Sequence, residues 1–188
     1  MPGLIEQVLG LGLERKELIK DHPKALVGGH RIPYPPRDMA SLVTILKGRN
    51  VQTYLALEAT TPGGIDFLEA HLHIPTIIRL EEKETDKSMR KLLRTMNTPV
   101  DLISIDGRGL PLDADTIWKY IQGGRDEYTR EFGKGAPVDY GIPKLRPGGC
   151  VLVNLADPGS REVWYKIRSR HSQCYQSPFV GMAHAAVP

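Results

Sequence analysis

The chain of 188 residues is 40% hydrophobic and 25% charged, and its formal net charge is +3. These values are ordinary for a soluble globular protein, and the length accommodates one domain with a full core without requiring a second. No apolar stretch approaches the roughly 18 residues of a membrane-spanning helix, and the N-terminus lacks the basic and apolar regions of a secretory signal, so we expect a cytoplasmic protein with no membrane partner.

Residues 1–37 are expected to form a helical leader and a connector. Residues 4–21 carry apolar side chains on an irregular helical face, which would pack on the domain, on a second subunit or on a protein partner. Residues 28–36 include three prolines, so this stretch is expected to be extended. His30 lies within it and could reach the edge of the sheet as a general base, although a surface position in the connector is the simpler alternative.

Residues 38–188 are expected to form one α/β domain. Asp38 is expected to cap a helix that ends at Gly48, because apolar residues between them recur at helical spacing. Beyond that helix strands and helices alternate, which predicts crossover connections and a parallel sheet. The expected strands are 52–57, 76–80, 102–105, 150–155, 173–176 and 180–187, and the expected helices between them are 86–96, 113–122 and one around 163–170.

Three further features have simple expectations. Residues 123–137 are rich in glycine and charge, and this segment is a candidate for a mobile flap over the edge of the sheet. Basic residues cluster at 87–94 and 161–170, but both clusters lie on predicted helices, where a solvated face is the usual role and a nucleic-acid partner is not expected. Cys150 and Cys174 fall inside predicted strands, so they are interpreted as small buried hydrophobic residues.

Two segments are the most informative part of the chain, namely Val100–Gly107 and Lys144–Val153. Each is a short apolar run bounded by turn residues, which is typical of a strand buried on both faces of a parallel sheet. The first ends in Asp106 followed by glycine. Asp106 is therefore expected at the carboxyl edge of the sheet, where open α/β folds bind their ligands.

Between residues 38 and 187 the order of elements and these two segments resemble the class I S-adenosylmethionine-dependent methyltransferases, especially small O-methyltransferases. That resemblance implies a Rossmann-like, mostly parallel sheet with helices on both faces and a C-terminal antiparallel strand pair. The stretch between Glu81 and Ile103 has room for one helix only, so one edge strand is expected to be missing. Dinucleotide-binding dehydrogenases fit less well, because no Gly-x-Gly-x-x-Gly follows the first strand and because the chain ends in a strand pair.

The resemblance places the cofactor, S-adenosylmethionine, over the first strand and its turn. Gly63 and Gly64 would present backbone amides, while Glu58 could pair with the ammonium group of the cofactor. Glu81 or Glu82, after the second strand, would hold the ribose hydroxyls, and Asp106 would form the wall of the adenine pocket. Ala56 stands where the family carries an acidic residue, and the glycine-rich turn departs from the family pattern.

A metal site is also implied by the resemblance, because metal-dependent O-methyltransferases place oxygen ligands after these strands. Asp106, Asn154 and Asp157 would supply the oxygen-rich shell that Mg²⁺ prefers, and the metal would orient a substrate hydroxyl and lower its pKa. The alternative is structural, with Asp106 capping a turn and Asp157 beginning a helix before Pro158.

Two functions remain open from the sequence. The first is O-methyl transfer from S-adenosylmethionine to a hydroxyl of a small molecule or sugar, with Asp106, Asn154 and His30 as candidate catalytic residues. The second is a catalytically inactive protein of the same fold that serves as a binding or structural subunit. The first is the leading hypothesis, and the altered glycine-rich turn and the shortened sheet are the support for the second.

Overall fold

A computed structural model describes residues 26–27, 30–31, 35–58, 67–69, 71–79, 85–106, 110–130 and 137–185. A six-stranded mixed sheet forms its centre, with the strand order β4-β3-β5-β8-β10-β9. The first four of these strands are mutually parallel, whereas β10 runs antiparallel to both of its neighbours. The bounds of the strands, in chain order, are Thr53–Glu58 (β3), Thr76–Arg79 (β4), Val100–Asp106 (β5), Leu145–Asn154 (β8), Ser172–Gln176 (β9) and Val180–His184 (β10).

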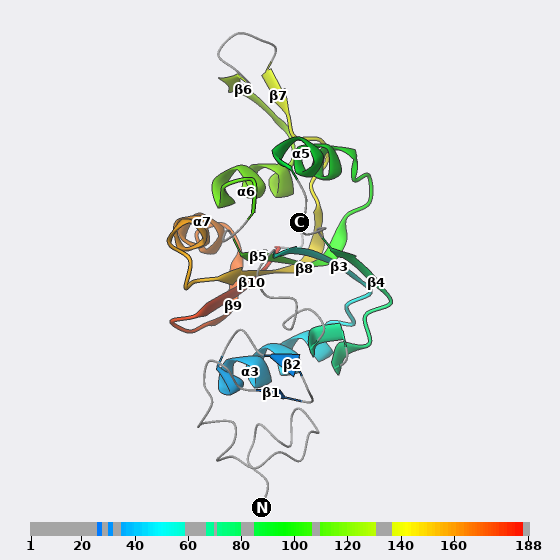
Figure 1. The fold of residues 1–188 in the computed structure, drawn as a ribbon, viewed down its shortest axis with the longest axis vertical. Helices are drawn as coiled ribbons and strands as arrows, with labels where there is room; N and C mark the ends of the chain where they lie inside the picture. The colour runs from blue at the N-terminus through cyan, green and yellow to red at the C-terminus, as the bar shows by residue number, and fades with distance from the viewer. Residues whose placement is uncertain are drawn as a thin grey trace, which may run out of the picture.

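Helices cover both faces of the sheet (Figure 1). One face carries α5 (Asp86–Thr95), α6 (Ala114–Gln122) and α7 (Pro158–Arg168), and the other carries α3 (Pro36–Lys47) with the helical residues 67–69 and 71–72. The expected Rossmann-like α/β sheet with a C-terminal antiparallel pair is confirmed, and β4 is the outermost of the described strands on the side of β3. Within the described part of the chain, no helix is long and apolar enough to cross a membrane.

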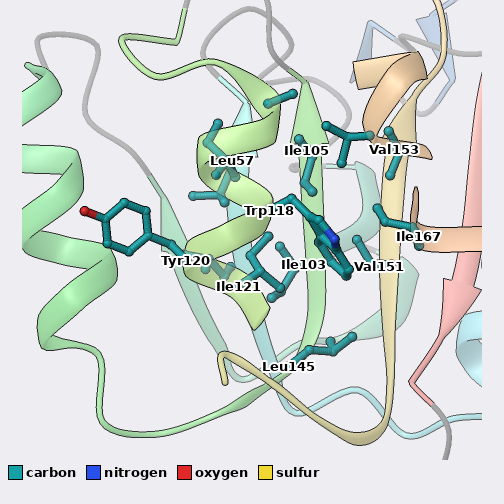
Figure 2. Close-up of a cluster of buried hydrophobic side chains, with 14 of the residues drawn as sticks. Leu57, Ile103, Ile105, Trp118, Tyr120, Ile121, Leu145, Val151, Val153 and Ile167 are labelled. Carbon is teal, nitrogen blue, oxygen red and sulfur yellow. The ribbon is translucent and has the colours of Figure 1, made fainter. Parts of the chain in front are cut away.

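Alternating residues of the central strands build two separate cores. Along β5, Ile103 and Ile105 face α6, where they meet Trp118 and Ile121 in one buried cluster (Figure 2). Leu102 directly precedes Ile103 and joins the second buried cluster, which lies under α3. A strand buried on both faces reads as a continuous apolar run, which explains why the sequence showed no alternation there.

Side-chain caps begin three of the helices. Thr85 and Ser88 form a reciprocal capping box at α5, Asp113 accepts a hydrogen bond from Thr116 N at α6, and Asp157 caps α7. The prediction that Asp38 caps the first helix is wrong, because the helix begins at Pro36 after the N-cap Pro35. Proline suits this first position, since its missing N–H would have no partner in the helix.

Two small antiparallel pairs lie outside the main sheet. The first is β1 (Leu26–Val27) with β2 (His30–Arg31), and the second is β6 (Arg125–Arg130) with β7 (Pro137–Asp139). The β6/β7 pair projects from the end of the molecule near α5 and α6 (Figure 1).

The expected flap at 123–137 is therefore in the wrong place to cover Asp106. Helix α6 returns to the amino ends of the parallel strands, where Ile121 O accepts a hydrogen bond from Lys144 N and Lys144 O accepts one from Val100 N. The β6/β7 pair starts from that edge, opposite the carboxyl ends. Crossover helices run antiparallel to the strands they connect, and this reversal fixes the position.

Candidate functional site

Asp106 is the last residue of β5, at the carboxyl edge of the sheet. In the parallel ladder it is the register partner of Glu58, the last residue of β3. Strand order reverses between these two strands, since the chain passes from β3 outward to β4 and then returns to β5 on the other side. Ligands of open α/β sheets bind at such a switch point, outside the carboxyl ends of the strands.

The Asp106 carboxylate is completely buried and is held by the neighbouring strand. Asn154 Nδ2 donates a hydrogen bond to Asp106 Oδ2 at 2.7 Å, and both side chains are buried. The other end of the same amide is also engaged, because Asn154 Oδ1 accepts from Ala156 N at 2.9 Å. Asn154 therefore fixes both the turn after β8 and the orientation of the Asp106 carboxylate.

Asp157 has a structural role at the start of α7. Its Oδ2 atom accepts a hydrogen bond from Ser160 N at 2.7 Å, in the geometry of an N-cap. Its carboxylate and the Asn154 oxygen thus already bind backbone amides. Among the described residues, no group of three His, Cys, Asp or Glu side chains could hold a metal ion. The donor set expected for Mg²⁺ does not fit this arrangement.

The structure describes only some of the other predicted site residues. Gly63, Gly64, Glu81 and Glu82 lie outside the described residues. For Glu58 the structure gives the backbone position in β3, beside Asp106. The backbone of His30 lies in β2 and pairs with Val27, in the small separate sheet.

A second polar group at the carboxyl edge was not foreseen as a site. Asp38, which is 5% exposed, accepts hydrogen bonds from Tyr175 Oη at Oδ1 and from Ser177 Oγ at Oδ2, both at 2.7 Å. Burial and the Asp38 carboxylate raise the pKa of the Tyr175 phenol. Val180, just after this turn, is the register partner of Asn154, so the group lies at the same edge as Asp106.

The sequence drew attention to Asp38 but suggested a different role for it. Asp38 stands at the start of an amphipathic helix, where a capping role is the usual interpretation. Its partners are more than 130 residues away in the chain, and only the closing strand pair brings them to the helix.

Beneath the edge, the face toward α3 is polar at one buried point. Tyr54 Oη and Ser104 Oγ share a hydrogen bond of 2.8 Å, and both residues are fully buried. Ala56, between Tyr54 and Glu58 on the same face, is also fully buried.

Arg161 of α7 directs its Nε and Nη2 atoms to Leu155 O at 3.0 and 2.8 Å. The Arg161 guanidinium is therefore bound to backbone, and the Asp106 and Asp38 carboxylates make this edge suited to a cation.

Comparisons with known proteins give resemblance at the level of solved structures. No protein-family model matches the chain, and no curated protein matches it significantly. A candidate O-methyltransferase from Klebsiella pneumoniae aligns with 99% of this chain and 92% of its own, at 13% identity and a TM-score of 0.48.

Two further structures are similar at the same level. The O-methyltransferase TomG from Streptomyces achromogenes, in complex with S-adenosylmethionine, covers 99% of this chain and 91% of its own at 10% identity and a TM-score of 0.41. An O-methyltransferase from Bacillus cereus, in complex with S-adenosylhomocysteine, covers 98% and 92% at 12% identity and a TM-score of 0.41. At these identities and TM-scores the likenesses assign this chain neither to a family nor to an activity.

Proposed function

We propose that this chain binds S-adenosylmethionine at the carboxyl edge of β3 and β5 and transfers its methyl group to a hydroxyl of a small molecule or sugar. The observation that carries the proposal is the switch point itself, where Glu58 and Asp106 end adjacent parallel strands as register partners. A fold of this kind provides its ligand site at that position.

The charge of the edge supports a cationic ligand. S-adenosylmethionine carries a sulfonium and an ammonium group, and carboxylates attract such charges strongly where water is excluded. Asp106 is buried, and Glu58 stands next to it in register. Two carboxylate residues side by side stabilise a bound cation more than they stabilise an anion.

The candidate site residues have distinct tasks in this proposal. The cofactor, when bound, supplies an electrophilic methyl group. Asp106 faces the cofactor or the acceptor hydroxyl, Glu58 pairs with the ammonium group, and Asn154 acts as a positioning residue that holds the Asp106 carboxylate at 2.7 Å. Gly63, Gly64, Glu81 and Glu82 complete the cofactor site in the way the sequence resemblance implies. His30 is the candidate base for the acceptor hydroxyl, and no magnesium ion is invoked.

Calorimetric titration with S-adenosylmethionine and S-adenosylhomocysteine tests the proposal. At about 100 times its Kd, the ligand should stabilise the fold by about 2.7 kcal/mol, which also raises the melting temperature. Asp106→Asn removes the charge while leaving an oxygen for Asn154, and it should weaken binding about tenfold or more, a loss of at least about 1.4 kcal/mol. Gly63→Trp should abolish binding.

Asp115→Asn is the matched control, because Asp115 lies on α6 and pairs with Lys119 and Lys166 on the surface. Its affinity should equal that of the unchanged chain. Circular dichroism must show that each variant is folded. The absence of heat and of thermal stabilisation at millimolar cofactor, with a folded protein, would contradict the proposal and favour a binding or structural role without methyl transfer.

A further inference from the structure

Cys174 occupies an irregular position in the edge strand β9. The register pairs Tyr175 with Met182 and Gln173 with Ala183, so Cys174 is an extra residue without a partner in the ladder. A bulge of this kind turns a side chain to the opposite face. As a result Cys174 and Tyr175, although adjacent in sequence, both pack against the cluster under α3.

The bulge brings the Cys174 sulfur against two nitrogen groups from distant elements. His184 Nδ1, on β10, lies 3.2 Å from Cys174 Sγ, and Arg49 Nη2, in the turn after α3, donates to the same sulfur at 3.5 Å. The second contact of Arg49 is with Gly148 O at 3.4 Å. No carboxylate in the described part of the chain pairs with Arg49. A base and a fixed cation beside a sulfur favour its thiolate form.

The two cysteines differ sharply in environment. Cys174 is partly exposed, whereas Cys150 on β8 is buried. Burial raises the pKa of the Cys150 thiol to about 12, and the nearby thiol of Cys174 adds to the rise while Arg49 opposes it. The expectation that both cysteines are small buried hydrophobic residues is confirmed for Cys150, whereas Cys174 is only partly buried.

The two thiols interact with each other, but the strand order separates their backbones. Strand β10 lies between β8 and β9. Two strand spacings separate the backbones by about 10 Å, beyond the roughly 7 Å that a disulfide can span. Unless the backbone moves, a disulfide at Cys174 therefore joins it to an external thiol.

We propose that Cys174 is a thiol-modification site that exchanges with small-molecule disulfides, with His184 as the proton acceptor and Arg49 as the fixed cation. The Cys174 proton passes to His184 Nδ1, and the thiolate attacks one sulfur of the external disulfide. A bond forms between Cys174 Sγ and that sulfur, while the other half leaves as a thiolate and takes up a proton. Cys174 is oxidised to a mixed disulfide, and the leaving half is reduced to a thiol.

The Cys174 site is separate from the cofactor edge. His184 pairs with Cys150 in the ladder, and Cys150 precedes Asn154 by four positions along β8, about 13 Å. The titratable and charged groups around the thiol are Arg49, His184, Cys150, Tyr175 and His171. The pKa of His171, which lies before β9, is lowered by burial and by charges that include His184. Modification would displace Arg49 from the sulfur and loosen the contact between the end of α3 and β9.

The test is the reaction of the folded protein with 5,5′-dithiobis(2-nitrobenzoate) and with glutathione disulfide, followed by absorbance and by intact mass. One thiol per chain should react while the protein is folded, and the second should react only after denaturation. Cys174→Ser should abolish the native reaction, and Cys150→Ala should keep it.

The variants His184→Gln and Arg49→Gln distinguish an activated thiol from one that is merely exposed. Each should slow the reaction of the folded protein, measured at one fixed pH, by about tenfold, with circular dichroism unchanged. The proposal is overturned if neither thiol reacts in the folded protein, if Cys174→Ser still reacts, or if the rate at fixed pH is unchanged in both variants.

Discussion

Asn154 shows how one side chain can serve fold and site together. Its amide donates from the nitrogen to Asp106 and accepts at the oxygen from Ala156 N, so both ends are already engaged within the protein. A buried carboxylate without such a donor would lose a hydrogen bond worth about 1.5–3 kcal/mol. The residue is therefore best understood as the support of Asp106 and not as a metal ligand.

Gly181 shows the opposite constraint, where the absence of a side chain is required. A Cβ placed on Gly181 would lie 2.6 Å from Trp164 Cε2 and 2.7 Å from Cδ2, and the indole is itself 1% exposed. We expect Gly181→Ala to lower the free energy of unfolding by about 1–3 kcal/mol, because the buried ring has little room to shift. Urea denaturation followed by tryptophan fluorescence measures this.

Gly159→Ala is the control for that experiment. Gly159 lies in the first turn of α7, and its Cβ would meet only Asp157 Oδ2 at 3.4 Å, an ordinary contact. Alanine is favoured over glycine within helices, so the unfolding free energy should stay constant or rise slightly. Equal losses in both variants would show that the contact with Trp164 is not the cause.

At the scale of elements, Asp101 ties three strands together at the amino edge of the sheet. Its Oδ2 atom accepts from Gln52 N, Thr53 N and Thr53 Oγ1 at 2.9–3.0 Å, and its Oδ1 atom pairs with Arg146 at 2.9 Å. These contacts join the starts of β3, β5 and β8. Hydrogen bonds to a charged group are stronger than neutral ones.

We expect Asp101→Ala to cost about 2 kcal/mol or more in unfolding free energy, because it leaves two backbone amides without their acceptor. Asp115→Ala gives the matched comparison, since its two ion pairs are on the surface and should contribute under about 1 kcal/mol. Chemical denaturation of both variants decides. If Asp101→Ala is as mild as Asp115→Ala, the strands are not joined through this carboxylate.

Lys144 joins β8 to the end of α5 and makes stability depend on pH. It is fully buried, and its Nζ atom donates to Met96 O at 2.9 Å. Burial lowers its pKa below the ordinary 10.5, an effect that Asp139 partly opposes. The unfolded chain then binds the proton more tightly than the folded chain, so stability should rise with pH in the window below 10.5.

Lys144→Met isolates this contribution, because it removes the titration while keeping a side chain of similar length. From pH 7 to pH 10 the unfolding free energy of the unchanged chain should increase relative to that of the variant. Denaturation at the two pH values measures the difference. A difference that stays constant, or that moves in favour of the variant, would contradict a lowered pKa.

At the scale of the whole molecule, the sheet was predictable because strongly apolar segments such as Ile103–Ile105 have few alternatives to a buried strand. The turn around Gly148 looked like the start of a strand in the sequence, whereas β8 begins earlier, at Leu145. The bounds of α5 and α6 agreed with the expected helices 86–96 and 113–122 within one residue, whereas α7 begins at Pro158, five residues before the expected start.

The sites were less predictable, because they depend on contacts between distant segments. Asp106 and Asn154 could be placed at one edge from the strand order alone, but their direct bond could not. The groups around Asp38 and Cys174 need the register of the closing strands, and a single bulge changes which face a residue occupies. The charge pattern and residue spacing of the sequence do not reveal these two groups.

Hydrogen–deuterium exchange with and without S-adenosylhomocysteine tests most directly whether the carboxyl edge of this sheet is a cofactor site. The account predicts slower exchange in peptides that contain the ends of β3, β5 and β8, including Glu58, Asp106 and Asn154, with no change around Asp101 at the amino edge. Unchanged exchange at saturating ligand, or protection confined to the amino edge, would contradict it.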